Sequence, residues 1–341
     1  MQSTHELPLT KKDFVTNQEP RWCPGCGDYA VLTAVQRVLP ELGIPRENFV
    51  WVSGIGCSSR FPYYMNTFGL HSIHGRALPI ATGIRVANPQ MSVWVTTGDG
   101  DSLSIGGNHL MHCLRRNVDI KILLFNNRIY GLTKGQYSPT SELGKVTKTS
   151  PAGAPDHPID PVSFAIGCGA TFVARSYDVA GDHLVEVLRR AASHRGTALV
   201  EILQNCPVFN EGAFAAVTNR ESAAVRQVRV KHGAPLLYGR DGTLGLAFSL
   251  STMRLEAVDL TKEPHRAQEV LVFDETNPMH AALLARASTE DDAPLPLGIL
   301  HATSRRTYES ILRENQTSAS AQPVGNALEQ LFRSGSSWWV Q

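Results

Sequence analysis

Short β-rich runs and helix-like stretches alternate along residues 20–215, and this alternation limits the possible folds more than any other feature. Apolar residues recur at helical spacing over 28–42, and Gly43 and Pro45 end that helix. Further on lie β-rich runs at 48–57, 91–101, 119–127 and 197–206, and helix-like stretches at 106–117 and 181–196. This order predicts an α/β fold, a mostly parallel sheet with helices on both faces, whose ligands bind at the carboxyl ends of the strands.

We interpret residues 20–215 as one domain, because the alternation weakens after about residue 215. Residues 1–19 form an N-terminal arm and residues 216–341 a C-terminal extension. In the extension we expect extra strands at 236–251 and 268–275 and a short surface helix at 304–315. The segment 133–163 is rich in Ser, Thr, Pro and Gly without apolar periodicity, which predicts a long loop that covers a site.

Charge and hydropathy argue against two classes of partner. The chain has 32 basic and 31 acidic residues, and no basic run of the length typical of nucleic-acid binding occurs. The N-terminal residues lack the apolar core of a signal peptide, and no stretch approaches the roughly 18 apolar residues that span a bilayer. We therefore expect a cytoplasmic protein without a nucleic-acid or membrane partner.

A turn of glycine and aspartate ends the run at 91–101. It consists of Gly98, Asp99, Gly100 and Asp101, and an asparagine pair, Asn126 and Asn127, ends the next β-rich run about 25 residues later, a gap that one βαβ crossover fits. Magnesium prefers carboxylate, amide and carbonyl oxygens, and glycines let the backbone approach phosphate groups. The alternative is an ordinary βα turn in which Asp99 caps the following helix.

Taken together, the two segments resemble the thiamine diphosphate motif, in which GDG is followed by NN. By that resemblance the side chains of Asp99 and Asn127 and the carbonyl of Ile129 are ligands of Mg²⁺. The resemblance also implies that Gly98, Gly100, Asp101 and Asn126 line the diphosphate.

Four of the six cysteines stand where a metal or cluster could bind. Cys23 and Cys26 share a Pro-Gly turn, whereas Cys57 and Cys206 each follow a predicted strand alone. Four sulfurs can hold zinc or a 4Fe-4S cluster, and a Cys-x-x-Cys pair does not decide between them. Zinc sites and redox dithiols usually gather ligands in local pairs, and burial of the thiols as small apolar groups is a further alternative. For Cys113 and Cys168, burial as inert thiols is the prediction.

Five segments closely resemble the β subunits of 2-oxoacid:ferredoxin oxidoreductases, and the resemblance spans residues 20–215. The segments read WCPGCG, GIGCSSRFPYY, HGRALPIATGIRVANP, GDGDSLSIGGNH and NNRIYGLTKGQYSPTS. The resemblance implies thiamine diphosphate, Mg²⁺ and one 4Fe-4S cluster as cofactors, with Cys23, Cys26, Cys57 and Cys206 as the cluster ligands.

The same resemblance implies the reaction and the partners. A 2-oxo acid is decarboxylated and oxidised in two one-electron steps through a radical, coenzyme A takes the acyl group, ferredoxin takes the electrons, and the reaction is reversible. An α subunit supplies the glutamate beside the pyrimidine ring and much of the substrate pocket, in an assembly expected to be α2β2. The segment YGLTKGQYSPTS looks more like the 2-oxoglutarate members than the pyruvate members, which remain the alternative.

Several residues are expected near the substrate or the cofactor ring. By the resemblance, Arg60 and Lys134 lie near the bound 2-oxo acid, where a cation could pair with a carboxylate, and solvated surface charge is the alternative for both. Leu132 shapes the pocket, and Ile55 and Gly56 approach the thiazolium ring. His74 and Arg76 face the active site, although a lone histidine is more often structural.

Two other functions remain open from the sequence. One is a non-oxidative thiamine enzyme whose cysteines hold structural zinc. The other is a non-catalytic electron-transfer or assembly subunit that has kept the cluster and lost the organic cofactor.

Overall fold

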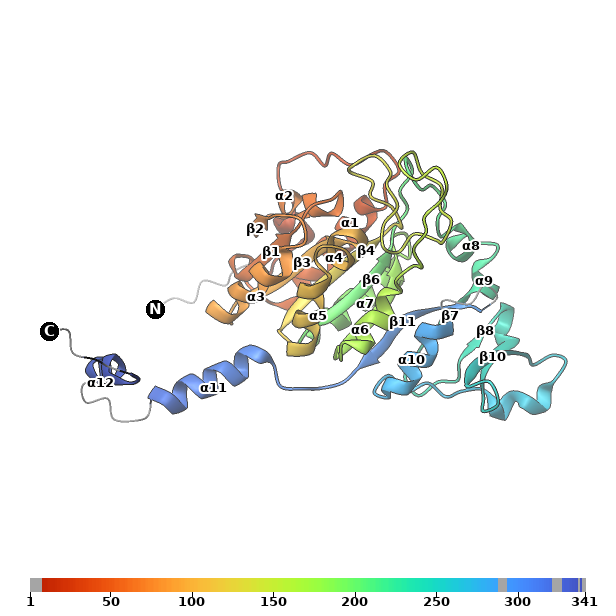
Figure 1. The fold of residues 1–341 in the computed structure, drawn as a ribbon. Coiled ribbons are helices and arrows are strands. Elements are labelled where there is room, and N and C mark those ends of the chain that lie inside the picture. Colours follow the sequence, from red (N-terminus) through yellow and green to blue (C-terminus); the bar gives the residue numbers. More distant parts are fainter. Residues whose placement is uncertain (1–7, 288–292, 321–326, 337, 339–341) are drawn as a thin grey trace.

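The computed structural model describes residues 8–287, 293–320, 327–336 and 338, and its centre is an eight-stranded sheet. The strands lie in the order β2-β1-β3-β4-β6-β5-β11-β7 (Figure 1). Neighbouring strands are parallel except β11 and β5, which are antiparallel. Their bounds are β1 Phe49–Ser53, β2 Phe68–His71, β3 Ser92–Gly98, β4 Ile120–Asn126, β5 Phe172–Tyr177, β6 Ala198–Leu203, β7 Gln227–Arg229 and β11 Leu295–Ala302. The predicted mostly parallel α/β fold is confirmed.

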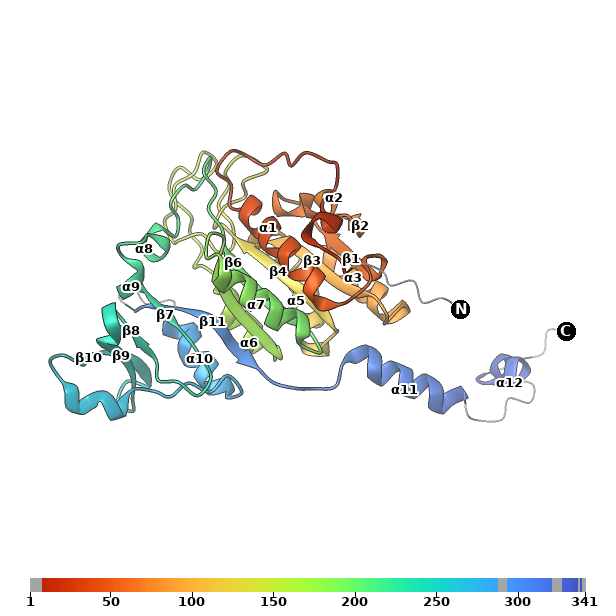
Figure 2. The ribbon, with the colours of Figure 1, turned by 180° about the vertical axis from the view of Figure 1, so that it is seen from behind.

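Helices cover both faces of the sheet. α1 (Asp28–Val38) and α7 (Asp182–Ser193) pack on one face, which Figure 2 shows in front. The opposite face carries α3 (Ala77–Ala87), α5 (Gly107–Arg116), α6 (Pro161–Gly167) and α10 (Pro278–Ala287). Side chains alternate along β1, so that Phe49 and Trp51 face the first set of helices and Val50 and Val52 the second. β1, β3, β4 and β6 are therefore buried on both sides, which explains why they read as largely apolar runs.

The chain after residue 215 contributes to the main sheet and also forms a smaller one. β7 and β11 extend the main sheet, and the three-stranded antiparallel sheet contains β8 (Leu237–Tyr238), β9 (Leu244–Ser249) and β10 (Arg254–Asp259). The strands predicted at 236–251 are confirmed as β8 and β9. The strand predicted at 268–275 is wrong, because Val270 and Val272 form only isolated bridges to Ala247 and Pro235. The sequence boundary at 215 therefore does not coincide with an edge of the main sheet.

The remaining helices are short or lie near the C-terminus. The surface helix expected at 304–315 is present as α11 (Tyr308–Ser320), which begins later and runs longer than predicted. α11 and α12 (Ala327–Arg333) reach away from the sheet (Figure 1). The others are α2 Phe61–Tyr64, α4 Asp99–Leu103, α8 Ala215–Thr218 and α9 Ala223–Arg226, with 3-10 turns at Lys11–Phe14, Leu39–Leu42, Arg46–Asn48, Ser58–Arg60, Arg240–Gly242 and Pro264–Glu269. Among the described helices, none combines the length and the hydropathy of a membrane span.

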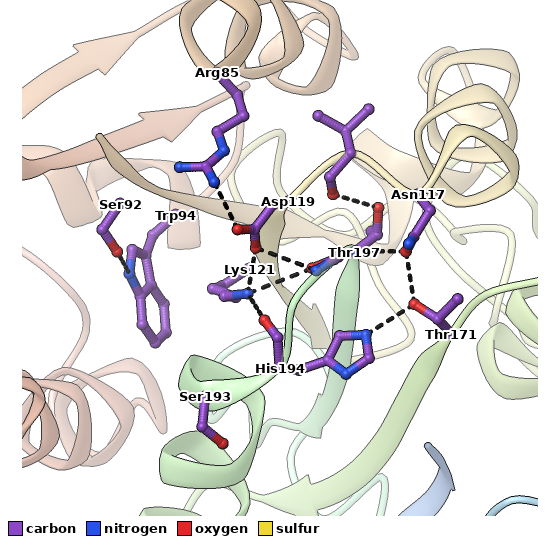
Figure 3. A network of polar contacts seen from close by, with 12 residues as sticks. Arg85, Ser92, Trp94, Asn117, Asp119, Lys121, Thr171, Ser193, His194 and Thr197 are labelled. Carbon is purple, nitrogen blue, oxygen red and sulfur yellow. Dashed lines mark hydrogen bonds and ion pairs between the residues drawn. The ribbon is translucent and has the colours of Figure 1, made fainter. Parts of the chain in front are cut away.

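A buried polar network ties the strands together at their amino ends (Figure 3). Lys121 Nζ lies 2.7 Å from Asp119 Oδ1, and Arg85 lies 2.7 Å from Asp119 Oδ2. Arg85 also contacts Glu309 of α11 at 3.3 Å, which holds the start of that helix against the sheet. Burial lowers the pKa of Lys121, and the negative charge of Asp119 opposes that shift. Because this network lies at the amino ends, it leaves the carboxyl ends free for the site.

The carboxyl ends of β1, β3, β4 and β6 meet at one edge of the sheet. The loops that follow these strands gather above that edge (Figure 1). The segment 127–160 contains no helix or strand, only isolated bridges, so the predicted long loop is confirmed. It lies over the ends of the strands, where a ligand of a parallel sheet binds.

Candidate active site

A cavity of about 520 Å³ opens at the carboxyl edge of the sheet. It gathers most of the predicted site residues, from the loops after β1, β3 and β4 and from the turn before α3: Ile55, Gly56, Cys57, His74, Gly98, Asp99, Gly100, Asp101, Asn127, Ile129 and Leu132. The structure does not place Arg60, Lys134, Asn126, Cys23, Cys26 or Cys206 in its lining. The loops predicted to form the site therefore do line one cavity, but not every residue predicted on those loops belongs to its lining.

Asp99 is a buried carboxylate at the cavity wall, only 3% exposed. It begins α4, and Ser138 Oγ and Thr140 Oγ1 of the long loop both donate to its Oδ2 at 2.6 Å. Burial raises the pKa of Asp99, and the two hydroxyl donors oppose that shift. A buried carboxylate beside a cavity is stabilised by a cation, so Asp99 suits a metal ligand.

Asn127 and Ile129 complete the predicted oxygen set. Asn127 Nδ2 donates to Gln204 Oε1 at 2.8 Å, and Asn127 Oδ1 accepts from the Ile129 amide at 3.1 Å. Within the described residues, no three His, Cys, Asp or Glu side chains are arranged to hold a metal ion. The magnesium set contains one carboxylate, one amide and one backbone carbonyl, so it is not a group of that kind. The donor chemistry fits Mg²⁺, whereas the metal itself stays a prediction.

Glycines keep the cavity open beside the strand ends. The Tyr130 ring packs over Gly100, where a Cβ would lie 2.2 Å from Tyr130 Cε1, and Tyr130 Oη donates to the Gly100 carbonyl at 3.0 Å. Gly56 has φ +144° with nothing within 4 Å of a Cβ position, so it faces open space. This backbone leaves room for a diphosphate close to the main chain.

Asp101 lines the cavity, but both of its carboxylate oxygens are hydrogen-bonded to groups of the protein. Oδ1 accepts from the amides of Ile55 and Gly75 and lies 2.7 Å from His74 Nδ1, while Oδ2 accepts from Thr97 Oγ1 at 2.7 Å. A Cβ on Gly54 would lie 2.1 Å from Asp101 Oδ2, so this position excludes larger residues. Asp101 therefore joins two loops of the cavity wall, a role that the sequence did not reveal.

The predicted cluster cysteines converge next to the cavity from three segments. A Cβ on Gly131 would lie 3.7 Å from Cys57 Sγ and 3.5 Å from Cys206 Sγ. Burial is the main cause that raises the pKa of the Cys26 thiol, and the charges of Asp28, Cys57 and Cys206 add to that shift. Burial likewise raises the pKa of Cys57 to about 12, with further contributions from Asp28, Cys206 and Cys23.

Cys23, Cys26, Cys57 and Cys206 therefore lie in one region, although the thiols do not form a ready-made metal group in the described residues. Cys57 lines the cavity itself, and Cys23 is exposed at the surface. Thiolate coordination would relieve the like-charge repulsion and the burial penalty, because a metal is a strong local positive charge. The donor set fits an iron–sulfur cluster, which stays a prediction.

The two remaining cysteines lie apart from these four. Cys113 is buried at 3% exposure in the core, as predicted. Cys168 is only half-buried, because it follows the last turn of α6. The prediction of burial therefore holds only in part for Cys168, which packs against the core without being fully enclosed.

Asp28 is a functional candidate that the sequence reasoning missed. It lies in the first turn of α1, lines the cavity and is 1% exposed, and within the described part of the chain neither carboxylate oxygen has a hydrogen-bond partner. Burial raises its pKa to about 7, and the charge of Asp178 adds to the shift. Its place two residues after Cys26, at the start of an apolar helix, was the available signal.

The cations expected near the substrate do not line the cavity, whereas Leu132 does. Leu132 lines the cavity at 46% exposure, whereas Lys134 is exposed on the following turn with φ +77°. Arg60 ends the 3-10 turn after Cys57 and is half-buried, and Arg76 is exposed. Their contacts with a substrate therefore stay predictions.

The fold and the cavity together define a thiamine diphosphate-binding domain. Residues 50–202 match the family described as thiamine pyrophosphate enzyme, C-terminal TPP binding domain. The chain is 52% identical over 343 residues to the 2-oxoglutarate oxidoreductase subunit KorB of Mycobacterium tuberculosis, covering 99% of this chain and 90% of that protein. The chain therefore belongs to the β subunits of the 2-oxoacid:ferredoxin oxidoreductases, as the sequence motifs had indicated.

Two further relatives agree with this family. The chain is 47% identical over 190 residues to 2-oxoacid:ferredoxin oxidoreductase 1, subunit beta, of Aeropyrum pernix, covering 56% of this chain and 60% of that protein. It also resembles the solved 2-oxoglutarate:ferredoxin oxidoreductase of Magnetococcus marinus with 2-oxoglutarate, coenzyme A and succinyl-CoA bound, with a TM-score of 0.77, 30% identity and 98% of each chain covered. As the β subunit of an enzyme that oxidises 2-oxo acids, the chain has an α subunit as its partner.

Proposed function

We propose that this chain is the cofactor-bearing half of an enzyme that converts 2-oxoglutarate, coenzyme A and oxidised ferredoxin to succinyl-CoA, CO₂ and reduced ferredoxin. The observation that carries the proposal is the position of Cys57, which belongs both to the cavity wall and to the group of converging thiols. A cofactor in the cavity and a cluster on the thiols would be neighbours, so electrons could pass between them over a short distance.

The cavity residues would hold thiamine diphosphate through Mg²⁺. Asp99, Asn127 and the Ile129 carbonyl supply oxygens of the kind Mg²⁺ prefers, and Gly98 and Gly100 leave room for the diphosphate. When bound, thiamine diphosphate supplies the nucleophilic carbon and the electron sink for loss of CO₂. The chain's own residues orient the cofactor, and the buried carboxylate of Asp99 holds the positive charge that the diphosphate requires.

Cys23, Cys26, Cys57 and Cys206 would hold one 4Fe-4S cluster, which accepts electrons singly. The exposure of Cys23 supports the transfer of electrons to an external carrier, because that side of the site reaches the surface. Ferredoxin fits this role, since no second cluster motif occurs in the sequence.

An α subunit would close the cavity. Exposed apolar side chains lie in or next to its wall: Leu132 lines the cavity, Ile73 precedes the lining residue His74, and Ile105 packs on Gly75, with exposures of 46%, 74% and 51%. Such a rim is typical of a surface covered in the assembly. The α subunit would also carry the glutamate beside the pyrimidine ring, and we propose an α2β2 assembly in the cytoplasm.

The names of the relatives support 2-oxoglutarate as substrate, and Arg60 and Lys134 are the cations predicted to pair with its second carboxylate. Pyruvate or another 2-oxo acid is the alternative. Turnover of the complex, coexpressed with its α subunit, is measured on a panel of 2-oxo acids with coenzyme A and viologen. The proposal predicts the highest kcat/KM for 2-oxoglutarate. A preference for pyruvate would overturn the substrate, and absence of turnover with every acid would overturn the reaction.

A further inference from the structure

The histidine of the cavity wall is held by a single atom of its ring. His74 Nδ1 lies 2.7 Å from Asp101 Oδ1, and the histidine side chain is 35% exposed toward the cavity that it lines. Asp101 is 2% exposed and already accepts from two backbone amides and one hydroxyl. A carboxylate in that position accepts, so Nδ1 is the donor and carries the proton.

The rest of the loop leaves the ring little freedom. Gly75 has φ +71°, and a Cβ there would meet Ile105 and Gly106 at 2.6 and 2.7 Å, so the backbone after His74 packs tightly. Before it, Ser72 bonds to Ser53 through both its amide and its hydroxyl, at 2.8 and 2.7 Å. The Tyr130 ring stands beside the imidazole at 6.2 Å between centroids. Among the described residues Nε2 has no hydrogen-bond partner, so it is the ring atom left for a molecule in the cavity that His74 lines.

We propose that His74 Nε2 exchanges a proton with the 2-oxo oxygen of the substrate, and that Asp101 is the positioning residue for His74. When the carbonyl carbon of a 2-oxo acid accepts a nucleophile, its oxygen gains an electron pair and needs a proton. Imidazolium gives the Nε2 proton to that oxygen and becomes neutral, while Nδ1 keeps its proton toward Asp101. When the oxygen becomes a carbonyl again in the acyl product, the same proton returns to Nε2, so no net proton is consumed.

Asp101 also holds the loop after β1, which is predicted to approach the thiazolium ring. The same Oδ1 atom that holds His74 accepts from the amide of Ile55, at 3.1 Å, in the loop predicted to approach the thiazolium ring. One carboxylate thus sets the distance between the imidazole and that loop. A shift of Asp101 would move both sides of the reaction together, which is the property of a positioning residue rather than a catalytic one.

The inference rests on the proposed function, and His74→Gln tests it in the α/β complex, with His265→Gln at an exposed site as the control. We expect kcat for the 2-oxo acid to fall about 100-fold in His74→Gln while KM and the Kd for thiamine diphosphate change less than about threefold. An unchanged kcat would overturn the inference. A parallel loss of cofactor affinity would also overturn it, because it would make His74 a binding residue. Loss of turnover in the wild-type complex would instead overturn the proposed function.

Two further measurements test the inference, and the first of them does not depend on turnover. Diethyl pyrocarbonate modification, mapped by peptide mass spectrometry, should label His74 in the free complex and be blocked by thiamine diphosphate, with His265 labelled in both states. Labelling of His74 that the cofactor leaves unchanged would place Nε2 outside the cavity. In a double-mutant cycle, Asp101→Asn should lower kcat in the wild-type background, and the loss in the double variant should be smaller than the product of the two single losses. Additive losses would mean that Asp101 acts independently of His74.

Discussion

Thr140 Oγ1 lies 2.6 Å from Asp99 Oδ2, so a hydroxyl of the long loop directly contacts the carboxylate proposed to bind magnesium. The same hydroxyl lies 2.9 Å from Asn126 Oδ1, at the end of β4. The loop is therefore part of the cofactor site, because it holds the orientation of two polar side chains at neighbouring strand ends. Ser138, two residues earlier, contacts the same Asp99 oxygen.

Thr140→Val should weaken binding of Mg²⁺ and thiamine diphosphate about tenfold, since partners of metal ligands typically contribute that much to affinity. The substitution keeps the shape of the side chain and removes the donor to Asp99. Titration of the complex by tryptophan fluorescence or calorimetry measures the Kd. Thr149→Val, at an exposed position of the same loop, is the matched control and should leave the Kd unchanged. Equal affinities in the two variants would show that the Thr140 contact has no influence on the site.

Cys57→Ala and Cys206→Ala should each lose the iron and the visible absorption of the complex and abolish viologen reduction. Each substitution removes one of the four thiolates that hold a cluster of this kind. Binding of thiamine diphosphate should be retained. Cys113→Ala and Cys168→Ala, outside this group, should keep their full iron content. Full electron transfer in Cys57→Ala would exclude its role as a ligand.

Gly100→Ala should destroy the cofactor site, because the new methyl would lie 2.2 Å from the Tyr130 ring and force it into the cavity or out of position. We expect loss of the thermal stabilisation that thiamine diphosphate gives to the wild-type complex. Gly107→Ala is the matched control, since α5 begins there and nothing lies within 4 Å of its Cβ position. A cofactor-dependent rise in Tm that survives in Gly100→Ala would contradict the geometry of Tyr130.

Stability should fall with acidity because of His194 at the amino end of the sheet. Burial lowers the pKa of His194 to about 4, and the positive charge of Lys121 adds to the shift. Between its ordinary pKa of about 6.5 and the folded value, the unfolded chain binds the proton more readily, so stability is present above pH 6.5 and is lost as pH falls toward 4.

Urea unfolding at pH 7 and pH 5 checks this contribution, which we expect to be about 1 kcal/mol, because the half-buried ring is partly screened by water. His194→Gln should show a correspondingly smaller loss of stability between the two pH values. The exposed His265→Gln should behave like the wild type. An identical pH dependence in all three proteins would show that His194 is protonated equally in the folded and unfolded states.

Four strands of the sheet, β1, β3, β4 and β6, were predictable because burial on both faces makes them continuous apolar runs. β5 was not predicted, although all six of its residues are buried, because Arg175, Ser176 and Tyr177 interrupt the apolar run. The edge strand β2 was not predicted, since Phe68 and Leu70 are exposed and its four residues show no alternation. Nor could local sequence place β11 between β5 and β7, because that insertion depends on pairing between distant segments. Strand pairing at the edges is decided by packing that no short window of sequence contains.

In the site, too, local motifs were predictable and contacts between distant segments were not. The loops with GDG and NN were predictable because each motif has its own local spacing. The four donors to Asp101 come from three segments, and the buried Asp28 owes its importance to the cysteines and the cavity around it. Such polar contacts depend on three-dimensional neighbours, so sequence reasoning identified Asp101 as a site residue but not its function.

The most direct test of the account is the visible spectrum of the anaerobically purified α/β complex before and after addition of 2-oxoglutarate with coenzyme A. A 4Fe-4S cluster beside the thiamine site predicts about four iron and four sulfide per β chain and a spectrum that bleaches on addition of the substrates. A colourless complex that contains zinc, or a cluster that stays oxidised in the presence of both substrates, would contradict it.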